Sequence, residues 1–206
     1  MTSKIEGEPK RGRGRPKTFD RAEALAAAML LFWERGYEGT TFDDLTTAMR
    51  INPSSFRNSF KSKELLYRET IDAYVLDTGE WFAGILFGEA NVRTAFSRLL
   101  EETAALYTRE DRPAGCMISL AATHVPPDLA SLKALTASHR HAAETAMAER
   151  IEQGQRDGQI DVNVDSLAFA AYFNTVFRGM AVQARDGASK SRLTDIARLA
   201  MTVFPA

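Results

Sequence analysis

Residues 20–62 contain several helix boundaries at short spacing, and this feature constrains the fold more than any other. Side chains that favour the helix N-cap recur here at Asp20, Thr41, Asn52 and Ser62. Pro53 occupies the first helical position after Asn52, and Gly36 is suited to end the first segment. The sequence therefore predicts three helices, over 20–35, 41–49 and 53–60.

The rest of the chain also has helical character. A fourth helix is expected from Ser62 through Tyr74 and on to about Phe87. Further helices are predicted near 91–109, 115–123, 128–156, 165–185 and 189–203. We predict an all-α fold, in which an N-terminal three-helix head is joined by a linker helix to a C-terminal helical bundle that dimerises. The expected domains are a flexible basic arm at 1–19, a DNA-binding domain at 20–67 and a ligand-binding and dimerisation domain at 68–206.

Charge is distributed unevenly along the chain. Up to Lys63 there are 12 Lys and Arg residues against 8 Asp and Glu, and from Glu64 onward 14 against 19. A basic N-terminal third indicates that this end meets phosphate.

The single Cys116 excludes an intramolecular disulfide and fits a reducing compartment. The first residues lack a signal-peptide core, and the longest apolar run, 24–33, is too short to span a membrane. We expect a cytoplasmic protein with no membrane partner.

Residues 41–60 have the spacing of a helix-turn-helix motif. On the second helix of this pair, Phe56 and Phe60 share one face, whereas Ser54, Arg57 and Asn58 lie opposite, with Ser55 on the flank. Guanidinium, amide and hydroxyl groups are the groups that read base edges in the major groove. The alternative is an ordinary solvated helix face.

Groups suited to phosphate surround this helix. Lys61 and Lys63 stand at the start of the next helix, and Thr40 and Thr41 stand at the start of the preceding one. Helix N-termini attract phosphate through free N–H groups and the helix dipole. Phosphate contacts would fix the register in which base contacts specify sequence.

The same stretch resembles the DNA-binding domain of the TetR family. The resemblance lies in FWERGYEGTT at 32–41, FDDL at 42–45, RINPSSF at 50–56 and FKSKELLY at 60–67. It covers about residues 20–70 without a gap, and GMAVQARDGA at 179–188 is similar to one C-terminal subgroup of the family. The resemblance implies a homodimeric, ligand-responsive repressor, with a dimer interface of four helices formed by the last two helices of each chain.

By position, the resemblance implies that Ser54, Ser55 and Arg57 face bases, and that Thr41, Ser59 and Lys63 hold phosphates. The predicted DNA-contacting residues outside the arm are Thr40, Thr41, Asn52, Ser54, Ser55, Arg57, Asn58, Ser59, Lys61 and Lys63. The chain departs from the family at Arg50, where Gly is usual and where a positive φ would strain Arg. It also departs on the second helix of the motif, which we call the reading helix because it would contact bases. There Arg57, Asn58 and Ser59 replace the family's frequent aromatic or His residues.

The basic arm supplies a second signal. Its Arg13-Gly14-Arg15-Pro16 segment resembles an AT-hook core, in which extended Arg side chains enter a narrow A·T minor groove. We therefore count Arg13 and Arg15 among the candidate DNA contacts. The alternative is a basic tail that adds nonspecific attraction.

The C-terminal part predicts an apolar cavity for a small hydrophobic or aromatic effector. Its candidate lining residues are Trp81, Phe96, Leu99, Cys116, Met117, Leu120, His124, Tyr172 and Phe173. Each of these can instead be ordinary core. Cys116 is expected near a helix N-terminus, where it is either a redox or electrophile sensor or an inert buried thiol.

Other function classes fit the sequence less well. An enzyme with Cys116 as nucleophile and His124 as base lacks an orienting third group, so we expect no catalysis. His139 and His141 point to different faces of a helix, so we expect no metal site and no cofactor. An architectural DNA binder that uses the arm without an effector remains the other alternative.

Overall fold

The computed structural model describes residues 19–121 and 129–205, and these residues form helices without any strand. The elements are α1 (Arg21–Arg35), α2 (Phe42–Ala48), α3 (Pro53–Phe60), α4 (Lys63–Gly88), α5 (Val92–Tyr107), α6 (Met117–Leu120), α7 (Ala130–Arg156), α8 (Ser166–Arg185) and α9 (Lys190–Ala200), the last followed by a 3-10 turn at Met201–Val203. The prediction of an all-α fold is confirmed.

The N-terminal boundaries of the first four helices follow from side-chain caps. The Asp20 carboxylate accepts from Ala22 N–H at 2.8 Å, and the Ser62 hydroxyl accepts from Leu65 N–H at 3.1 Å. Thr41 and Asn52 cap α2 and α3 in the same way. Each cap satisfies backbone donors that a helix start leaves unpaired, and so these predicted starts are confirmed.

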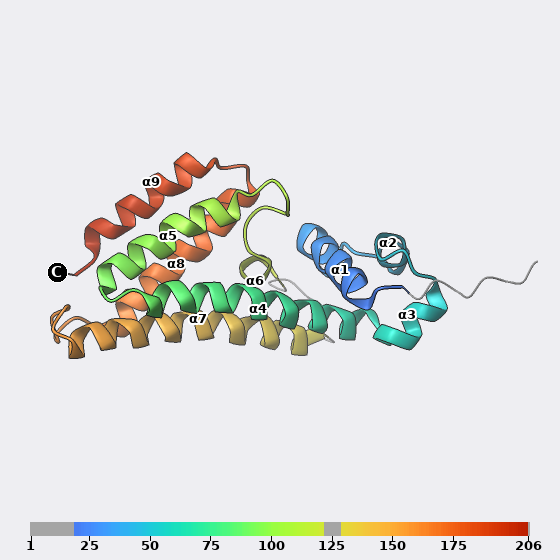
Figure 1. Ribbon diagram of the computed structural model, residues 1–206, viewed down its shortest axis with the longest axis horizontal. Helices are drawn as coiled ribbons and strands as arrows, with labels where there is room; N and C mark the ends of the chain where they lie inside the picture. Colours follow the sequence, from blue (N-terminus) through green and yellow to red (C-terminus); the bar gives the residue numbers. More distant parts are fainter. Residues whose placement is uncertain (1–18, 122–128, 206) are drawn as a thin grey trace, which may run out of the picture.

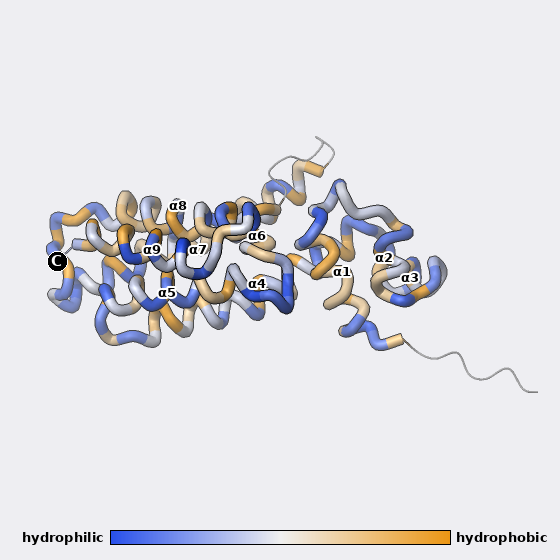
Figure 2. The backbone as a smooth tube through the Cα atoms, turned by 90° about the horizontal axis from the view of Figure 1, so that it is seen from above, coloured by the Kyte–Doolittle hydropathy of each residue, from blue (hydrophilic) through white to orange (hydrophobic). Residues whose placement is uncertain are grey.

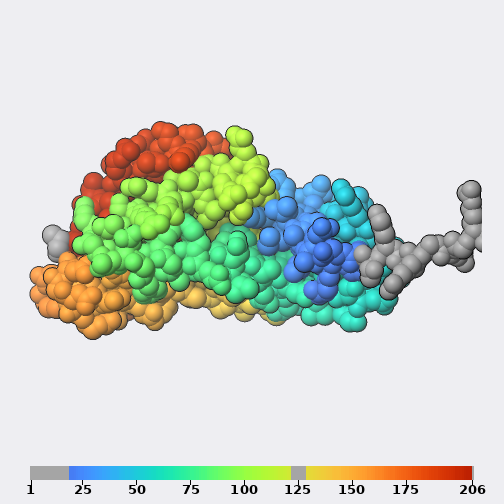
Figure 3. All heavy atoms as spheres, viewed as in Figure 1, coloured from blue at the N-terminus to red at the C-terminus, as the bar shows by residue number. Residues whose placement is uncertain are grey.

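Helices α1 to α3 form a small head at one end of an elongated molecule (Figures 1 and 3). Helix α4 leaves the head and continues into the body, where α5, α6 and α7 pack on it (Figure 1). Helix α8 packs on α5, α6 and α7, and α9 packs on α5 and α8. Seen from above, head and body still lie at opposite ends (Figure 2). The predicted domain boundary at 67/68 thus falls inside α4, so one continuous helix belongs to both parts.

Two aromatic contacts join α1 to α4. Phe32 meets Tyr67 edge-on with ring centroids 4.9 Å apart, and Trp33 meets Tyr74 in the same geometry at 5.1 Å. A further contact comes from α8, where the Arg185 guanidinium donates to the Glu34 backbone oxygen and, at 3.3 Å, to its carboxylate. The position of the head therefore depends on both α4 and α8.

The C-terminal end of α4 is held by a buried arginine from α7. Arg150 donates to the backbone oxygens of Leu86 at 2.8 Å, Glu89 at 2.9 Å and Ala90 at 3.3 Å. These bonds satisfy backbone oxygens at and just beyond the end of the helix, which lack intrahelical partners. Arg150 was not anticipated, because a charged residue in a polar helical sequence normally faces solvent.

Helix α6 is shorter than the expected segment 115–123. It spans only Met117–Leu120, and Ala121 already has an extended backbone. Before it, Gly115 has φ +79°, and a Cβ there would lie 2.5 Å from the backbone oxygen of Ala181 in α8. Glycine thus lets the start of α6 approach α8 closely.

Candidate DNA-binding surface and effector cavity

The polar face predicted on α3 is exposed in the structure. Phe56 and Phe60 are buried, and Phe56 packs edge-on against Phe42 of α2 at 4.8 Å. On the opposite side, Ser54, Arg57 and Asn58 are exposed, with Ser55 and Ser59 half-buried. The apolar face therefore fixes α3 to the head, and a guanidinium and an amide project from the other side.

The start of α3 is organised around the amide of Asn52. Its Oδ1 accepts from Ser55 N–H at 2.8 Å and from the Ser54 hydroxyl at 2.7 Å. The Asn52 oxygen is therefore used within the protein, and its Nδ2 remains as the group that can reach a phosphate or base. The Ser54 oxygen keeps lone pairs with which to accept from a base amino group.

The turn before α3 has the strained backbone foreseen at Arg50, whose φ is +53°. A non-glycine residue there carries a conformational cost that glycine avoids. Lys61, after α3, also has a positive φ of 66°, and its Nζ donates to Asn58 O at 2.9 Å. The second strained turn thus folds the Lys61 side chain back onto α3.

Lys63 lies with its ammonium 4.2 Å from the ring centroid of Tyr37. Burial lowers the pKa of Lys63, while Glu38 acts in the opposite direction. The cation–π contact keeps the side chain at the junction of α1 and α4, beside the reading helix.

Thr41 forms a capping box with Asp44. The Thr41 hydroxyl donates to the Asp44 carboxylate at 2.6 Å and accepts from Asp44 N–H at 3.1 Å. Hydrogen bonds from Thr41 are the main reason why the pKa of Asp44 is lowered. Arg35 also pairs with this carboxylate at 3.0 Å. The exposed Thr41 side chain is therefore engaged within α2 in the free protein.

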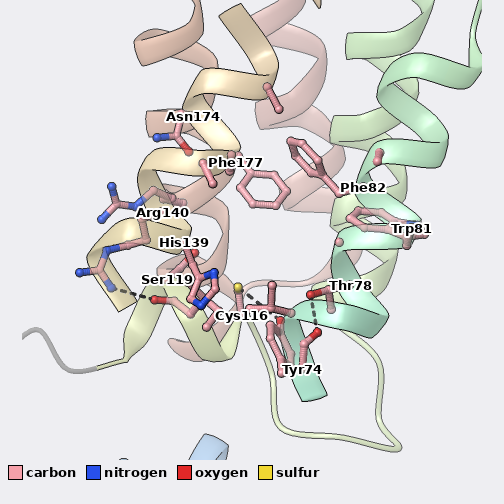
Figure 4. Close-up of a pocket in the computed structure, with 18 of the residues that line it drawn as sticks. Tyr74, Thr78, Trp81, Phe82, Cys116, Ser119, His139, Arg140, Asn174 and Phe177 are labelled. Carbon is pink, nitrogen blue, oxygen red and sulfur yellow. Dashed lines mark hydrogen bonds between the residues drawn. The ribbon is translucent and has the colours of Figure 1, made fainter. Parts of the chain in front are cut away.

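A cavity of about 280 Å³ lies in the body between α4, α5, α6, α7 and α8 (Figure 4). Most of its wall is aromatic or aliphatic, with Trp81, Phe82 and Phe177 labelled in Figure 4. It is lined by Tyr74, Val75, Thr78, Gly79, Trp81, Phe82, Ala83, Leu106, Tyr107, Cys116, Ile118, Ser119, His139, Arg140, Ala142, Ala143, Ala146, Asn174, Phe177 and Arg178.

A few polar groups interrupt the apolar wall. The Tyr74 hydroxyl donates to Cys116 Sγ at 3.3 Å, and burial raises the pKa values of Tyr74 and Tyr107 well above their usual range. Both tyrosines are therefore neutral phenols at physiological pH. The Arg140 guanidinium donates to the backbone oxygens of Ile118 and Ala121, and burial lowers its pKa.

Comparison with known proteins identifies the family. The model for bacterial regulatory proteins of the tetR family matches residues 24–70. The HTH-type transcriptional repressor ComR of Escherichia coli K12 is 35% identical over 198 residues, covering 95% of this chain and 94% of that protein. The repressor BdcR of the same organism is 29% identical over 187 residues, with 91% and 90% covered. The chain belongs to the TetR family.

Solved structures agree with this assignment. A cysteine mutant of the TetR family regulator CifR, solved in complex with 26-base-pair operator DNA, superposes with a TM-score of 0.90 at 35% identity. The match covers 93% of this chain and 100% of that one. This TetR family chain is a DNA-binding transcriptional regulator, as the sequence resemblance implies.

Two further observations concern the residues described. No group of three or more His, Cys, Asp or Glu side chains there could hold a metal ion. None of the helices in 19–121 and 129–205 has the length and hydropathy required to cross a membrane.

The predicted DNA contacts need one correction. Thr40 has 0% exposed surface, and its hydroxyl donates to the backbone oxygen of Gly36 at 2.7 Å. Its side chain closes the turn after α1 and is not available to a phosphate. Arg13 and Arg15 lie outside the described residues.

Sequence reasoning missed Arg21 beside the reading helix. Its guanidinium donates to Ser59 O at 3.3 Å, pairs with Glu69 at 2.6 Å and lies 4.6 Å from the Phe60 ring centroid. Arg21 thereby ties the C-terminal end of α3 to α1 and α4. Its place directly after the Asp20 cap gave no sign of this role.

The predicted cavity residues need a larger correction. Trp81 and Cys116 do line the cavity, and His124 lies outside the described residues. The others that the structure describes lie elsewhere: Phe96, Leu99, Met117, Leu120, Tyr172 and Phe173. Phe96 and Phe173 pack 4.9 Å apart in a core cluster with Phe204, whereas Tyr172 is exposed on α8. Aromatic character alone does not distinguish core from cavity.

Proposed function

We propose that this chain is a homodimeric repressor that leaves its operator when a small, largely apolar effector fills the cavity of the body. The observation that carries the proposal is the position of the cavity. It borders α4 at Tyr74, whose ring packs on Trp33 of the head. An effector there would act on the helix that positions the reading face.

Repression is supported by the relatives. ComR and BdcR are named as repressors, and CifR was solved with operator DNA. A repressor of this kind acts in the cytoplasm, where bacterial DNA is found, and it needs no catalysis.

Base reading by Arg57 and Asn58, with Ser54 and Ser55 beside them, is part of the proposal, as are phosphate contacts from Thr41, Ser59, Lys61 and Lys63.

Dimerisation is supported by apolar side chains left exposed on α8 and α9, which pack against each other. The large ones are Leu167, Tyr172 and Val182 on α8 and Leu199 on α9, with Val203 in the 3-10 turn that follows. Where such groups form a contiguous exposed patch, the patch marks a protein–protein interaction site. A two-fold pairing of these helices would present two reading heads to a palindromic operator.

The test has two steps, beginning with selection of bound sequences from random DNA by the full-length protein. A palindromic consensus with half-sites about one DNA turn, or 34–36 Å, apart is expected. The selected duplex is then used in a release screen with small apolar compounds. Compounds that release DNA should also raise the melting temperature of the protein, since they bind the folded state. A sharp consensus that no compound releases would favour the architectural alternative.

A further inference from the structure

Asn174 of α8 lines the cavity and carries a buried hydrogen-bond acceptor that is unpaired. The residue is 3% exposed and lines the cavity, and its Oδ1 has no hydrogen-bond partner among the described residues. Its Nδ2 donates to the Glu144 carboxylate of α7 at 2.7 Å. Because a carboxylate accepts only, this bond fixes which end of the amide is oxygen. Figure 4 shows that oxygen on the side of Phe177, with the nitrogen turned away from it.

An unpaired buried carbonyl is uncommon in folded proteins, because desolvation of the oxygen is not compensated. A ligand that donates one hydrogen bond to Oδ1 would remove this cost while it occupies the cavity. A ligand that fills the cavity is therefore expected to carry a hydrogen-bond donor.

The charges of the wall restrict the kind of donor. Among the residues that the structure describes, no Asp or Glu lines the cavity, whereas Arg140 and Arg178 do. The nearby Glu144 carboxylate is engaged by the Asn174 amide. An ammonium ligand would thus lose its hydration without gaining a counter-charge, so a neutral hydroxyl fits this wall better than a cation.

The shape of the wall restricts the rest of the ligand. Rings from Trp81, Phe82, Tyr107 and Phe177 line the cavity from three helices. A protein cavity of about 150 Å³ holds benzene, so a volume of about 280 Å³ admits one ring with short substituents. Aromatic walls favour a flat, polarisable ligand through ring contacts.

We propose that the cavity selects a neutral hydroxylated aromatic molecule of the phenol class, whose O–H donates to Asn174 Oδ1 while the ring packs among the aromatic side chains. This inference rests on the proposed function, in which the cavity is the effector site. It adds the chemical class of the effector and the residue that recognises it.

The experiment compares two probes of similar shape, 4-ethylphenol and 4-ethyltoluene, in which the hydroxyl of the first is replaced by a methyl group in the second. Their affinities for the full-length protein are measured by titration calorimetry. The wild type should bind 4-ethylphenol roughly tenfold more tightly, the value of one net hydrogen bond. This comparison needs no variant, so it holds even if a substitution prevents folding.

The Asn174→Leu variant tests the acceptor. It should lose or reverse the preference, since a hydroxyl would then be buried without a partner. Thr78→Val is the matched control, because Thr78 also lines the cavity but its hydroxyl donates to the Tyr74 backbone oxygen. The control variant should keep the preference for 4-ethylphenol.

The other outcomes separate the two proposals. Equal affinities of the wild type for both probes, or a preference that survives in Asn174→Leu, would overturn the assignment of Asn174 and leave the effector cavity standing. If the cationic probe 2-phenylethylamine bound more tightly than either neutral probe, the assignment of the ligand to the neutral phenol class would be wrong. If no aromatic probe binds at all, the inference is overturned, and the cavity's role as effector site is then decided by the release screen.

Discussion

The Tyr74 hydroxyl donates to the Cys116 thiol at 3.3 Å, so a side chain of α4 is bonded to the residue that precedes α6. The ring of the same tyrosine meets Trp33 of α1 edge-on at 5.1 Å. Cys116 faces the cavity and Trp33 belongs to the head. One buried side chain therefore contacts both the proposed effector site and the DNA-reading part.

Tyr74→Phe is expected to weaken the coupling between effector and operator. The ring contact with Trp33 stays, so operator affinity without effector should be nearly unchanged. The factor by which 4-ethylphenol weakens operator binding should fall about threefold to tenfold, because the hydrogen bond that joins Cys116 at the cavity to α4 is lost. Fluorescence anisotropy with labelled operator measures both quantities. An unchanged factor would show that the O–H···S bond plays no part in the response.

Tyr67 should make stability sensitive to alkaline pH. Burial raises the pKa of Tyr67 to about 12, against about 10 in the unfolded chain. As the pH rises, Tyr67 is therefore deprotonated at a lower pH in the unfolded chain than in the folded protein. Its contribution to the free energy of unfolding is fully present below pH ~10 and is lost as the pH rises towards ~12. The free energy of unfolding should fall by up to about 3 kcal/mol from this group.

Tyr67→Phe removes that contribution, so the urea-unfolding free energy of the wild type, measured relative to that of the variant, should fall by up to about 3 kcal/mol as the pH rises from about 10 to about 12. Tyr74 and Tyr107 titrate alike in both proteins and cancel in the comparison. Parallel pH profiles would contradict the assignment.

Arg57→Ala and Lys63→Ala should affect DNA binding in different ways. Loss of Arg57 should cost about 1–3 kcal/mol on the selected operator and relax base preference at one position. Loss of Lys63 should weaken all sequences alike and lower the salt slope by about one unit. Arg156→Ala, at an exposed arginine in the last turn of α7, is the charge control and should change neither quantity. Base-specific loss in Lys63→Ala would argue against a phosphate contact.

Leu199→Asp should weaken the dimer. The side chain is 69% exposed on α9, in the face proposed to pair. Burying a carboxylate there in two symmetry-related places should cost at least about 2 kcal/mol, or roughly thirtyfold in the dissociation constant measured by sedimentation. Leu76→Asp is the matched control, since Leu76 is 67% exposed on α4. Equal dissociation constants for the two variants would place the interface elsewhere.

The parts of the fold that depend on neighbouring residues could be predicted from sequence. Asp20, Thr41, Asn52 and Ser62 cap helices through bonds to backbone groups two or three residues away. The reading face followed in the same way, because Phe56 and Phe60 are one helical turn apart. Local chemistry was sufficient in both cases.

The cavity depends on contacts between distant segments, and these could not be read from spacing. Phe96 has the same sequence signature as a pocket residue, yet Phe173 and Phe204 enclose it. Asn174 was overlooked because a polar residue in an apolar helix gives no sign of what its amide meets. Only the approach of Glu144 from α7 shows which amide atom is unpaired.

The three hydrogen bonds from Arg150 fix the C-terminal end of α4, so any tilt of the helix would pivot near Leu86, which we call the fulcrum. At about 1.5 Å per residue, Tyr74 lies about 18 Å from that fulcrum and Lys63 about 35 Å. A sideways step of about 1 Å beside the cavity would thus grow to about 2 Å where the head begins. In a two-fold dimer the same displacement would occur in both chains, so a small ligand in the proposed effector site would change the distance between the two reading helices.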